Sequence, residues 1–174
     1  MFAALSFAGS FVFDPWAECG TTATALQPRG ATVLCNSLHV VHDAQLGLLD
    51  PFQLVVYRQV AALCLPAGYF IVTAPTSVVL LLDLALPLLA RVSPLVCVWV
   101  PRAYYHAGPP ARRQWLAGLS TAGRLHLLAG ASARTPVARD DDCLWMLIFW
   151  DNATRLQCLA PELRQSCASF HFVV

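Results

Sequence analysis

The sequence predicts an α/β fold: a doubly wound, mostly parallel sheet with helices on both faces and a C-terminal antiparallel hairpin. Short apolar segments rich in β-branched residues alternate along the chain with segments of helical spacing. Each predicted strand is almost continuously apolar, as is typical of strands buried on both faces, and 57% of the 174 residues are hydrophobic. This length suits one domain, which we assign to residues 1–155, with residues 156–174 as a C-terminal tail.

The first predicted strand covers residues 11–13 and leads to a helix that begins at Thr21, where threonine acts as the cap. Gly30 ends this helix. A second buried strand covers residues 31–35, so the opening of the chain forms a strand–helix–strand unit.

A second helix and a third strand continue the alternation. Helical spacing extends over residues 52–65 until Gly68 breaks it, and residues 69–72 form the third strand. The helix that follows has Ser77 as its expected cap and ends at Val92.

The second half of the chain begins with a strand at residues 95–100 and a helix at residues 111–122. One face of this helix, with Trp115, Leu119 and Ala122, is expected to be buried. Arg112 and Arg113 are expected to lie in solvent. Two further strands, residues 125–128 and 143–150, can pair as an antiparallel hairpin.

The net charge bears on whether the chain binds nucleic acid, and the cysteines bear on the cellular compartment. The net charge is +1 and all 11 basic residues are arginine, so no basic face recruits nucleic acid by charge alone. The seven cysteines lie far apart without a Cys-x-x-Cys pair. We interpret them as reduced thiols, most of them buried, in an intracellular protein. Nothing in the sequence indicates an oligomeric state.

A metal site is not expected. His39, His42 and Asp43 are three potential ligands within five residues. No further group of ligands completes a coordination shell, so solvated or capping roles are favoured.

The run of residues 69–90 is long enough to span a bilayer and contains one charge, Asp83. Its internal prolines, Pro75 and Pro87, and the aspartate weaken the membrane interpretation. A strand followed by a helix in a buried sheet explains the same run, and we favour that interpretation over a small membrane protein anchored by residues 69–90.

Three strand ends carry the residues best suited to bind a ligand. Residues 14–22 form an acid-to-glycine turn into a helix, Asn36 follows the second strand, and residues 73–76 follow the third. The carboxyl ends of parallel strands meet at one edge of a sheet, where ligands bind near the topological switch point. Each loop also has a plain interpretation: an ordinary capped turn, a strand-end cap at Asn36, and a simple loop at residues 73–76.

Residues 14–22 resemble the Asp-Pro-Phe-x-Gly-x-Gly-Thr-Thr signature of class I S-adenosylmethionine-dependent methyltransferases, especially DNA methyltransferases of the adenine-N6 (amino) type. The resemblance covers residues 11–150 and implies a Rossmann-like fold, S-adenosylmethionine as cofactor and DNA as a possible partner. It implies cofactor-binding roles for Asp14, Pro15, Trp16, Gly20, Thr21, Thr22 and Asn36. It implies a catalytic loop, the family's Asp/Asn/Ser-Pro-Pro-aromatic, at Thr73, Ala74, Pro75 and Thr76.

The sequence departs from the family pattern in both loops. Glu18 replaces the first glycine of the cofactor loop and puts a negative charge near the expected position of the methionine carboxylate. Asn36 replaces the usual ribose-binding acid. Thr73 and Thr76 replace the group that accepts the target amine and the aromatic ring that stacks on a flipped base. These changes predict poor cofactor affinity and impaired catalysis.

Two interpretations of function therefore remain open beside the membrane alternative. One is a methyltransferase with degenerate motifs, and the other is a non-catalytic partner-binding or relic domain. A second group, Arg102, Tyr104, Tyr105 and His106, follows the fourth strand. It could contact nucleic acid, or it could be a surface loop with aromatic anchors.

Overall fold

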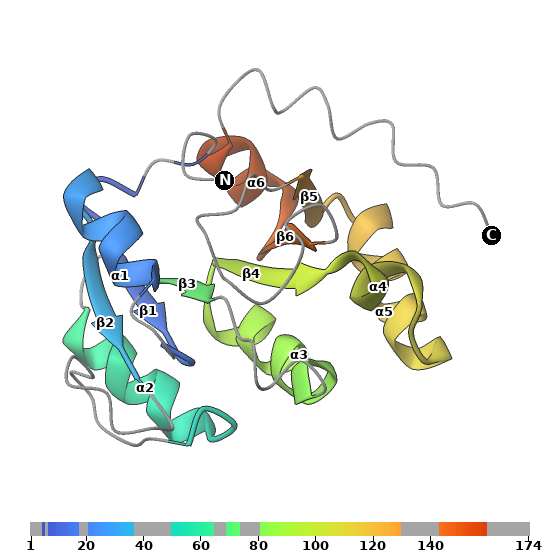
Figure 1. Ribbon diagram of the computed structural model, residues 1–174, viewed down its shortest axis with the longest axis horizontal. Coiled ribbons are helices and arrows are strands. Elements are labelled where there is room, and N and C mark those ends of the chain that lie inside the picture. Colours follow the sequence, from blue (N-terminus) through green and yellow to red (C-terminus); the bar gives the residue numbers. More distant parts are fainter. Residues whose placement is uncertain are drawn as a thin grey trace.

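Six strands form one sheet in the computed structural model, in the order β2-β1-β3-β4-β6-β5 (Figure 1). The structure describes residue 5 and residues 7–17, 21–36, 50–64, 69–73, 81–129 and 143–159. The strands are β1 (Phe11–Asp14), β2 (Thr32–Cys35), β3 (Phe70–Thr73), β4 (Leu95–Pro101), β5 (Leu125–Ala129) and β6 (Cys143–Phe149). The helices are α1 (Thr21–Leu26), the 3-10 turn η1 (Gln27–Arg29), α2 (Leu54–Leu63), α3 (Leu82–Val92), α4 (Arg102–His106), α5 (Pro110–Thr121) and α6 (Asn152–Cys158).

The sheet has the predicted mixture of strand directions. Strands β2, β1, β3 and β4 pair in parallel, whereas β6 runs antiparallel to both of its neighbours, β4 and β5. Every residue of β6 is buried, and β4 is buried from Leu95 to Val100. Burial on both faces explains why these strands are continuously apolar instead of alternating with polar residues. The predicted fold class and the C-terminal hairpin are confirmed.

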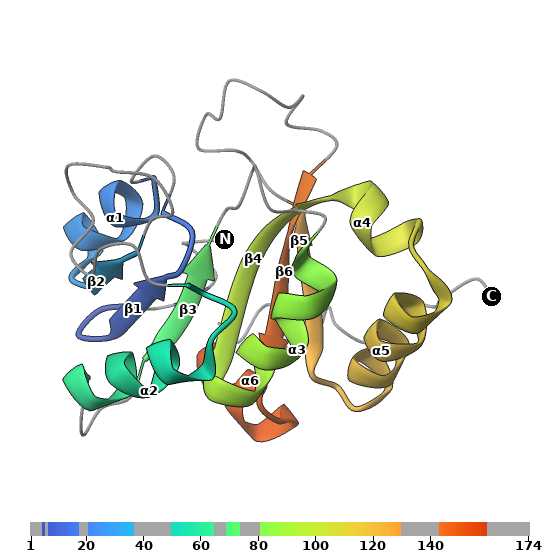
Figure 2. The same ribbon diagram turned by 90° about the horizontal axis from the view of Figure 1, so that it is seen from below.

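Two apolar cores lie on opposite faces of the sheet, because successive strand residues point to opposite sides. What we call the α2–α3 core contains, among others, Phe13, Trp16, Tyr57, Ile71, Leu86 and Val98. What we call the α1–α6 core contains, among others, Val12, Leu26, Val72, Cys97, Leu147 and Leu159. Figure 1 shows α3 below β4 and α6 above it, and Figure 2 shows α2 and α3 in front of the sheet.

The chain changes direction across the sheet at β1. It passes from β1 to β2 on one side, and then returns past β1 to β3 and β4 on the other. The switch point therefore lies between β1 and β3. The carboxyl ends of β1, β2 and β3 share one edge, because the three strands are parallel.

Two short helices were not predicted. Helix α4 directly follows β4, and it buries Tyr104 and Tyr105, so these rings act as anchors of a helix and not of a surface loop. Helix α6 continues past residue 155, and the next residue, Leu159, is 1% exposed and forms a β-bridge with Leu5. The packed unit therefore includes residues up to Leu159.

The membrane-anchor interpretation of residues 69–90 finds no support in the described part of this run. Its first portion is β3, which pairs with β1 and β4, and its last portion belongs to the 11-residue α3, which contains Pro87. Within the described residues, none of the helices combines the length and apolar character needed to cross a bilayer. Of the five cysteines within these residues, Cys35, Cys64, Cys97 and Cys143 are buried and Cys158 is partly buried.

Candidate functional site

The ends of β1, β2 and β3 bring three of the predicted site residues to one edge of the sheet. Asp14 ends β1 and pairs with Cys35, and Asn36 immediately follows. Thr73 ends β3, whose Ile71 pairs with Phe13 of β1. The acid-to-helix turn and the start of the threonine loop therefore lie on neighbouring strands, on the two sides of the switch point.

A network of short hydrogen bonds fixes the turn after β1. The carboxylate of Asp14 accepts a hydrogen bond from the backbone N–H of Trp16 at 3.1 Å. The backbone N–H of Asn36 donates to the carbonyl oxygen of Asp14 at 2.9 Å, and Ala17 N–H donates to the carbonyl of Asn36 at 2.8 Å. The aspartate thus holds the chain in a tight turn before α1.

Asn36 holds the same turn through its side chain. Its Nδ2 donates to the carbonyl oxygen of Pro15 at 3.1 Å, and the residue is 0% exposed. This contact is the strand-end role that the sequence left open. The predicted ribose contact of Asn36 stays a prediction.

Trp16 and Thr73 are buried at the same edge. Trp16 is 2% exposed and its ring packs against Phe52, with 5.9 Å between ring centroids. Thr73 is 0% exposed. Among the residues that the structure describes, neither Trp16 Nε1 nor Thr73 Oγ1 has a hydrogen-bond partner. Buried polar atoms are usually paired, so these two atoms are unusual.

The remaining predicted site residues are only partly described. Thr21 begins α1, and Thr22 is buried in its first turn at 4% exposure. Gly20, Ala74, Pro75 and Thr76 lie outside the described residues, as do Glu18, Ser77, His39, His42 and Asp43. In the part of the chain that is described, no group of three or more histidine, cysteine or acidic side chains could hold a metal ion.

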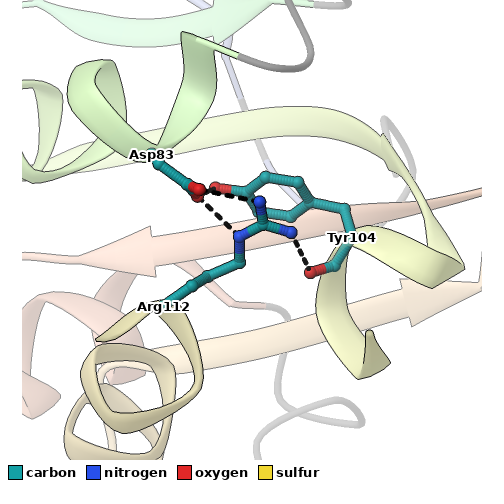
Figure 3. Close-up of polar contacts among 3 residues, drawn as sticks. All are labelled: Asp83, Tyr104 and Arg112. Carbon is teal, nitrogen blue, oxygen red and sulfur yellow. Dashed lines mark hydrogen bonds and ion pairs between the residues drawn. The ribbon is translucent and has the colours of Figure 1, made fainter. Parts of the chain in front are cut away.

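One polar cluster was missed by the sequence analysis, and it corrects the expectation that Arg112 is solvated (Figure 3). Arg112 of α5 donates to both carboxylate oxygens of Asp83 in α3, from Nε at 2.6 Å and from Nη2 at 2.7 Å. The hydroxyl of Tyr104 donates to Asp83 at 2.8 Å, and Arg112 Nη1 donates to the carbonyl of Tyr104 at 3.1 Å. The Arg112 side chain is 12% exposed.

The electrostatics of this cluster indicate a structural role. Hydrogen bonds from Arg112 lower the pKa of the Asp83 carboxyl, so the carboxylate stays charged. Burial, with the hydrogen bond to Asp83, raises the pKa of Tyr104, so this phenol is a poor proton donor at neutral pH. The guanidinium also lies 4.0 Å from the centroid of the Tyr104 ring, as a cation–π contact. The cluster ties α3, α4 and α5 together.

Comparisons with known proteins agree with this architecture. No protein-family model matches the chain, and no curated protein is a significant match. Among solved structures, an rRNA methylase from Streptococcus thermophilus is 11% identical, with a TM-score of 0.50 over 84% of this chain and 90% of that one. The fibrillarin/Nop5p complex (13% identity, TM-score 0.48, 80% and 72% coverage) and the CurJ carbon methyltransferase (11%, 0.49, 83% and 49%) are also similar.

At 11% identity, the similarity to the rRNA methylase shows a shared fold and does not extend to activity or substrate. The chain therefore has a Rossmann-like methyltransferase fold. In this architecture the carboxyl edge at β1 and β3 is the place where a ligand is expected.

Proposed function

We propose that this chain is an S-adenosylmethionine-binding, methyltransferase-like domain of DNA amino-methyltransferase descent, with weakened cofactor affinity and impaired catalysis. The observation that carries the proposal is the placement of the Asp14 turn and Thr73 at the ends of neighbouring strands, beside the switch point. Doubly wound sheets bind ligands at this position. The methyltransferase fold supports the same assignment.

The residues after β1 fit part of a cofactor site. The turn of residues 14–17 is held by hydrogen bonds, and the buried indole N–H of Trp16 has no partner among the described residues. In the proposal, Gly20 lets a ligand approach the backbone closely, and Thr21 and Thr22 lie beside it. Bound cofactor would supply an electrophilic methyl group. Asn36 fits less well, because its amide already binds Pro15.

The features of Thr73 support impaired catalysis. In the related methyltransferases, the corresponding residue accepts hydrogen bonds from the amine that is methylated. The Thr73 side chain is fully buried, so its hydroxyl is poorly placed to accept from a target amine. Methyl transfer would then depend mainly on proximity of the amine to the methyl group.

Calorimetric titration with S-adenosylmethionine tests the proposal. We expect weak binding, with a dissociation constant above about 10 μM, in the range of −7 kcal/mol or less favourable. Gly20→Asp should abolish it, because a carboxylate would occupy the cofactor loop. Gly118→Asp is the matched control, since Gly118 lies on α5 with nothing within 4 Å of an added Cβ. Submicromolar binding would contradict the weakened site, and a complete lack of binding would contradict a cofactor site of any kind.

Transfer of a tritiated methyl group to DNA tests the second half of the proposal. We expect incorporation close to that of the Gly20→Asp variant. Rapid incorporation into adenine by the unaltered chain would show that catalysis is intact.

A non-catalytic partner-binding domain is the second candidate, and exposed apolar side chains favour it. On α2 and α3 these are Leu54, Val55, Leu63 and Leu84, and Leu84 is 71% exposed. A partner that covers these side chains would bury apolar surface on both helices. This candidate replaces the first if S-adenosylmethionine does not bind.

A further inference from the structure

Charge is distributed unevenly along the chain, although the net charge is only +1. Residues 84–139 contain seven of the 11 arginines and no acidic residue, whereas residues 1–83 contain two arginines and five acidic residues. Residues 140–174 again contain two arginines and five acidic residues, of which Asp140, Asp141 and Asp142 lie outside the described residues. The small net charge therefore conceals a basic central segment, which includes β4, α4, α5 and β5.

Helix α4 has one buried and one solvent-exposed side. Tyr104 and Tyr105 are buried, whereas Arg102 and His106 are exposed. Arg102 and His106 are the first and last residues of the helix, so they lie on one face, about 6 Å apart along the helix axis. The His106 ring contacts the Tyr105 ring edge-to-face, with 4.9 Å between ring centroids. This contact orients the exposed imidazole.

Helix α5 adds a third exposed basic side chain, Arg113, in its first turn. The preceding arginine, Arg112, points inward instead: it donates to the carbonyl of Tyr104 and binds the carboxylate of Asp83 (Figure 3). These contacts hold the first turn of α5 to α4, and they engage the single acidic side chain of α3. We call the three exposed residues the α4–α5 surface: Arg102, His106 and Arg113.

Helix α4 lies past the carboxyl edge of the sheet, on the strand next to β3. Thr73 ends β3 and pairs with Val98, and β4 continues to Pro101 before α4 begins. At about 3.3 Å per residue, these three further residues carry β4 about 10 Å beyond the end of β3. Figure 2 shows α4 at this end of β4. A long ligand on α4 would therefore pass close to the edge that carries the candidate cofactor site.

The side chains of the α4–α5 surface suit a nucleic-acid backbone. Guanidinium groups bind phosphate oxygens in bidentate geometry, and arginine is the usual residue for phosphate recognition. Ring side chains next to such arginines stack on bases. Three groups spread over two helices match a ligand with repeated phosphates better than a ligand with one.

We propose that Arg102, His106 and Arg113 form a docking surface for the sugar–phosphate backbone of a nucleic acid. The inference rests on the proposed function for the choice of polyanion, because a domain of DNA methyltransferase descent is expected to act on nucleic acid. The two arginines contact phosphates and fix the position of the strand, and the His106 ring packs against a base. The surface thus supplies a partner-binding face separate from the cofactor loop.

Fluorescence anisotropy of a labelled DNA duplex, repeated at several salt concentrations, tests the two phosphate contacts. The logarithm of the association constant falls linearly with the logarithm of the salt concentration. In Arg102→Gln and in Arg113→Gln, this slope should become less negative by about 0.9, because one phosphate fewer is neutralised. Each variant should bind roughly eightfold more weakly at 0.1 M salt, and the slope of the double variant should change by about 1.8.

Arg91→Gln is the matched control. Arg91 is also exposed, but it lies in the last turn of α3, which leads to the start of β4 at the opposite edge of the sheet. Its affinity and salt slope should equal those of the unaltered chain. All three arginines are exposed, so the thermal midpoints of the variants should stay within about 2 °C of the unaltered chain. An equal change of slope in Arg91→Gln, or no change in the other two variants, would overturn the inference.

The same measurements with single-stranded DNA and single-stranded RNA of one sequence distinguish the kinds of nucleic acid. The probe that loses most affinity in the double variant identifies the strand that the surface fits. With single strands, His106→Ala should weaken binding by roughly fivefold or more, whereas His106→Phe should keep most of the affinity. Poly-L-glutamate that binds as tightly, with the same dependence on both arginines, would overturn the inference in favour of an acidic protein partner.

Calorimetric titration with S-adenosylmethionine separates this inference from the proposed function. The arginine variants should bind the cofactor as the unaltered chain does, since neither side chain belongs to the cofactor loop. Cofactor binding without any arginine-dependent binding of nucleic acid would leave the proposed cofactor site standing and overturn the docking surface. Arginine-dependent binding of nucleic acid by a chain that binds no S-adenosylmethionine would support the surface and overturn the cofactor site.

Discussion

Gly108 lies against the Arg112 guanidinium, so a single methyl group added there should break the cluster that joins α3, α4 and α5. A Cβ at position 108 would lie 2.8 Å from Nη1 of Arg112, 2.9 Å from Cδ and 3.1 Å from Cζ. The side chain cannot move away freely, because Asp83 and Tyr104 hold it through hydrogen bonds. Gly108→Ala should therefore displace the guanidinium and destabilise the chain.

The magnitude follows from the exposure of the ion pair. The side chains of Arg112 and Asp83 are 12% and 32% exposed, so solvent screens part of their attraction. A partly exposed bidentate pair contributes about 1 kcal/mol. The cation–π contact with Tyr104 adds roughly 0.5–1 kcal/mol. The expected loss is about 1–2 kcal/mol, or roughly 3–6 °C in thermal midpoint for a chain of this size.

Thermal unfolding followed by circular dichroism measures this loss, and Gly118→Ala is its control. An added Cβ at Gly118 meets nothing within 4 Å, and this residue lies within α5. Its replacement should stabilise the helix by about 0.5–1 kcal/mol. Since Arg112 lowers the pKa of Asp83, the effect of Gly108→Ala should be complete above about pH 4, the ordinary pKa of a carboxyl. It should shrink as the pH falls further.

The same Gly108→Ala change in an Arg112→Ala variant tests whether the guanidinium is the group that the added methyl displaces. The three atoms nearest to the added Cβ all belong to Arg112, so Gly108→Ala should have almost no effect once that side chain is removed. An equal loss of stability in both backgrounds would show that the guanidinium is not what Gly108 accommodates.

Two other perturbations test the packing of the sheet. Burial lowers the pKa of His126 from 6.5 to about 4, so the unfolded chain binds the extra proton first as the pH falls. The free energy of unfolding should therefore decrease as the pH falls from 6.5 to 4, by up to about 1.4 kcal/mol per pH unit. The urea midpoint of His126→Gln should depend less on pH in this range. On α3, Leu86→Ala should cost about 2–5 kcal/mol of stability because Leu86 is 0% exposed. Leu84→Ala should change stability by less than about 0.5 kcal/mol because Leu84 is 71% exposed. Equal urea midpoints for the two variants would contradict the described orientation of α3.

The strands could be predicted because a strand that is buried on both faces consists almost entirely of apolar residues, which is visible in the local sequence. The apolar residues of β4 and β6 reveal these strands without knowledge of their neighbours. The convergence of Asp14 and Thr73 was also predictable, since parallel strands bring their carboxyl ends to one edge.

Helix α4 and the polar cluster could not be predicted from local patterns. Asp83 and Arg112 are 29 residues apart, so their pairing depends on how α3 and α5 pack. Helix α4 has five residues, too few for a periodic signal, and it is stabilised by burial of its tyrosines. Helix α6 did carry a local signal, because Asp151 caps it by accepting a hydrogen bond from Thr154 N–H at 2.7 Å.

The contacts within the candidate site also depend on packing. The sequence placed Asn36 and Thr73 at strand ends but gave no information on their burial. Tertiary structure decides that the Asn36 amide binds the Pro15 carbonyl and that the Thr73 hydroxyl finds no partner among the described residues.

Ultraviolet cross-linking of radiolabelled S-adenosylmethionine, followed by peptide mapping, tests the proposed cofactor site most directly. The chain has no lysine, so trypsin cuts only after arginine and places residues 14–22 in the peptide of residues 1–29. We expect the label in this peptide and its loss in Gly20→Asp. Label confined to peptides beyond Arg91, or equal labelling of the Gly20→Asp variant, would contradict a cofactor site at the end of β1.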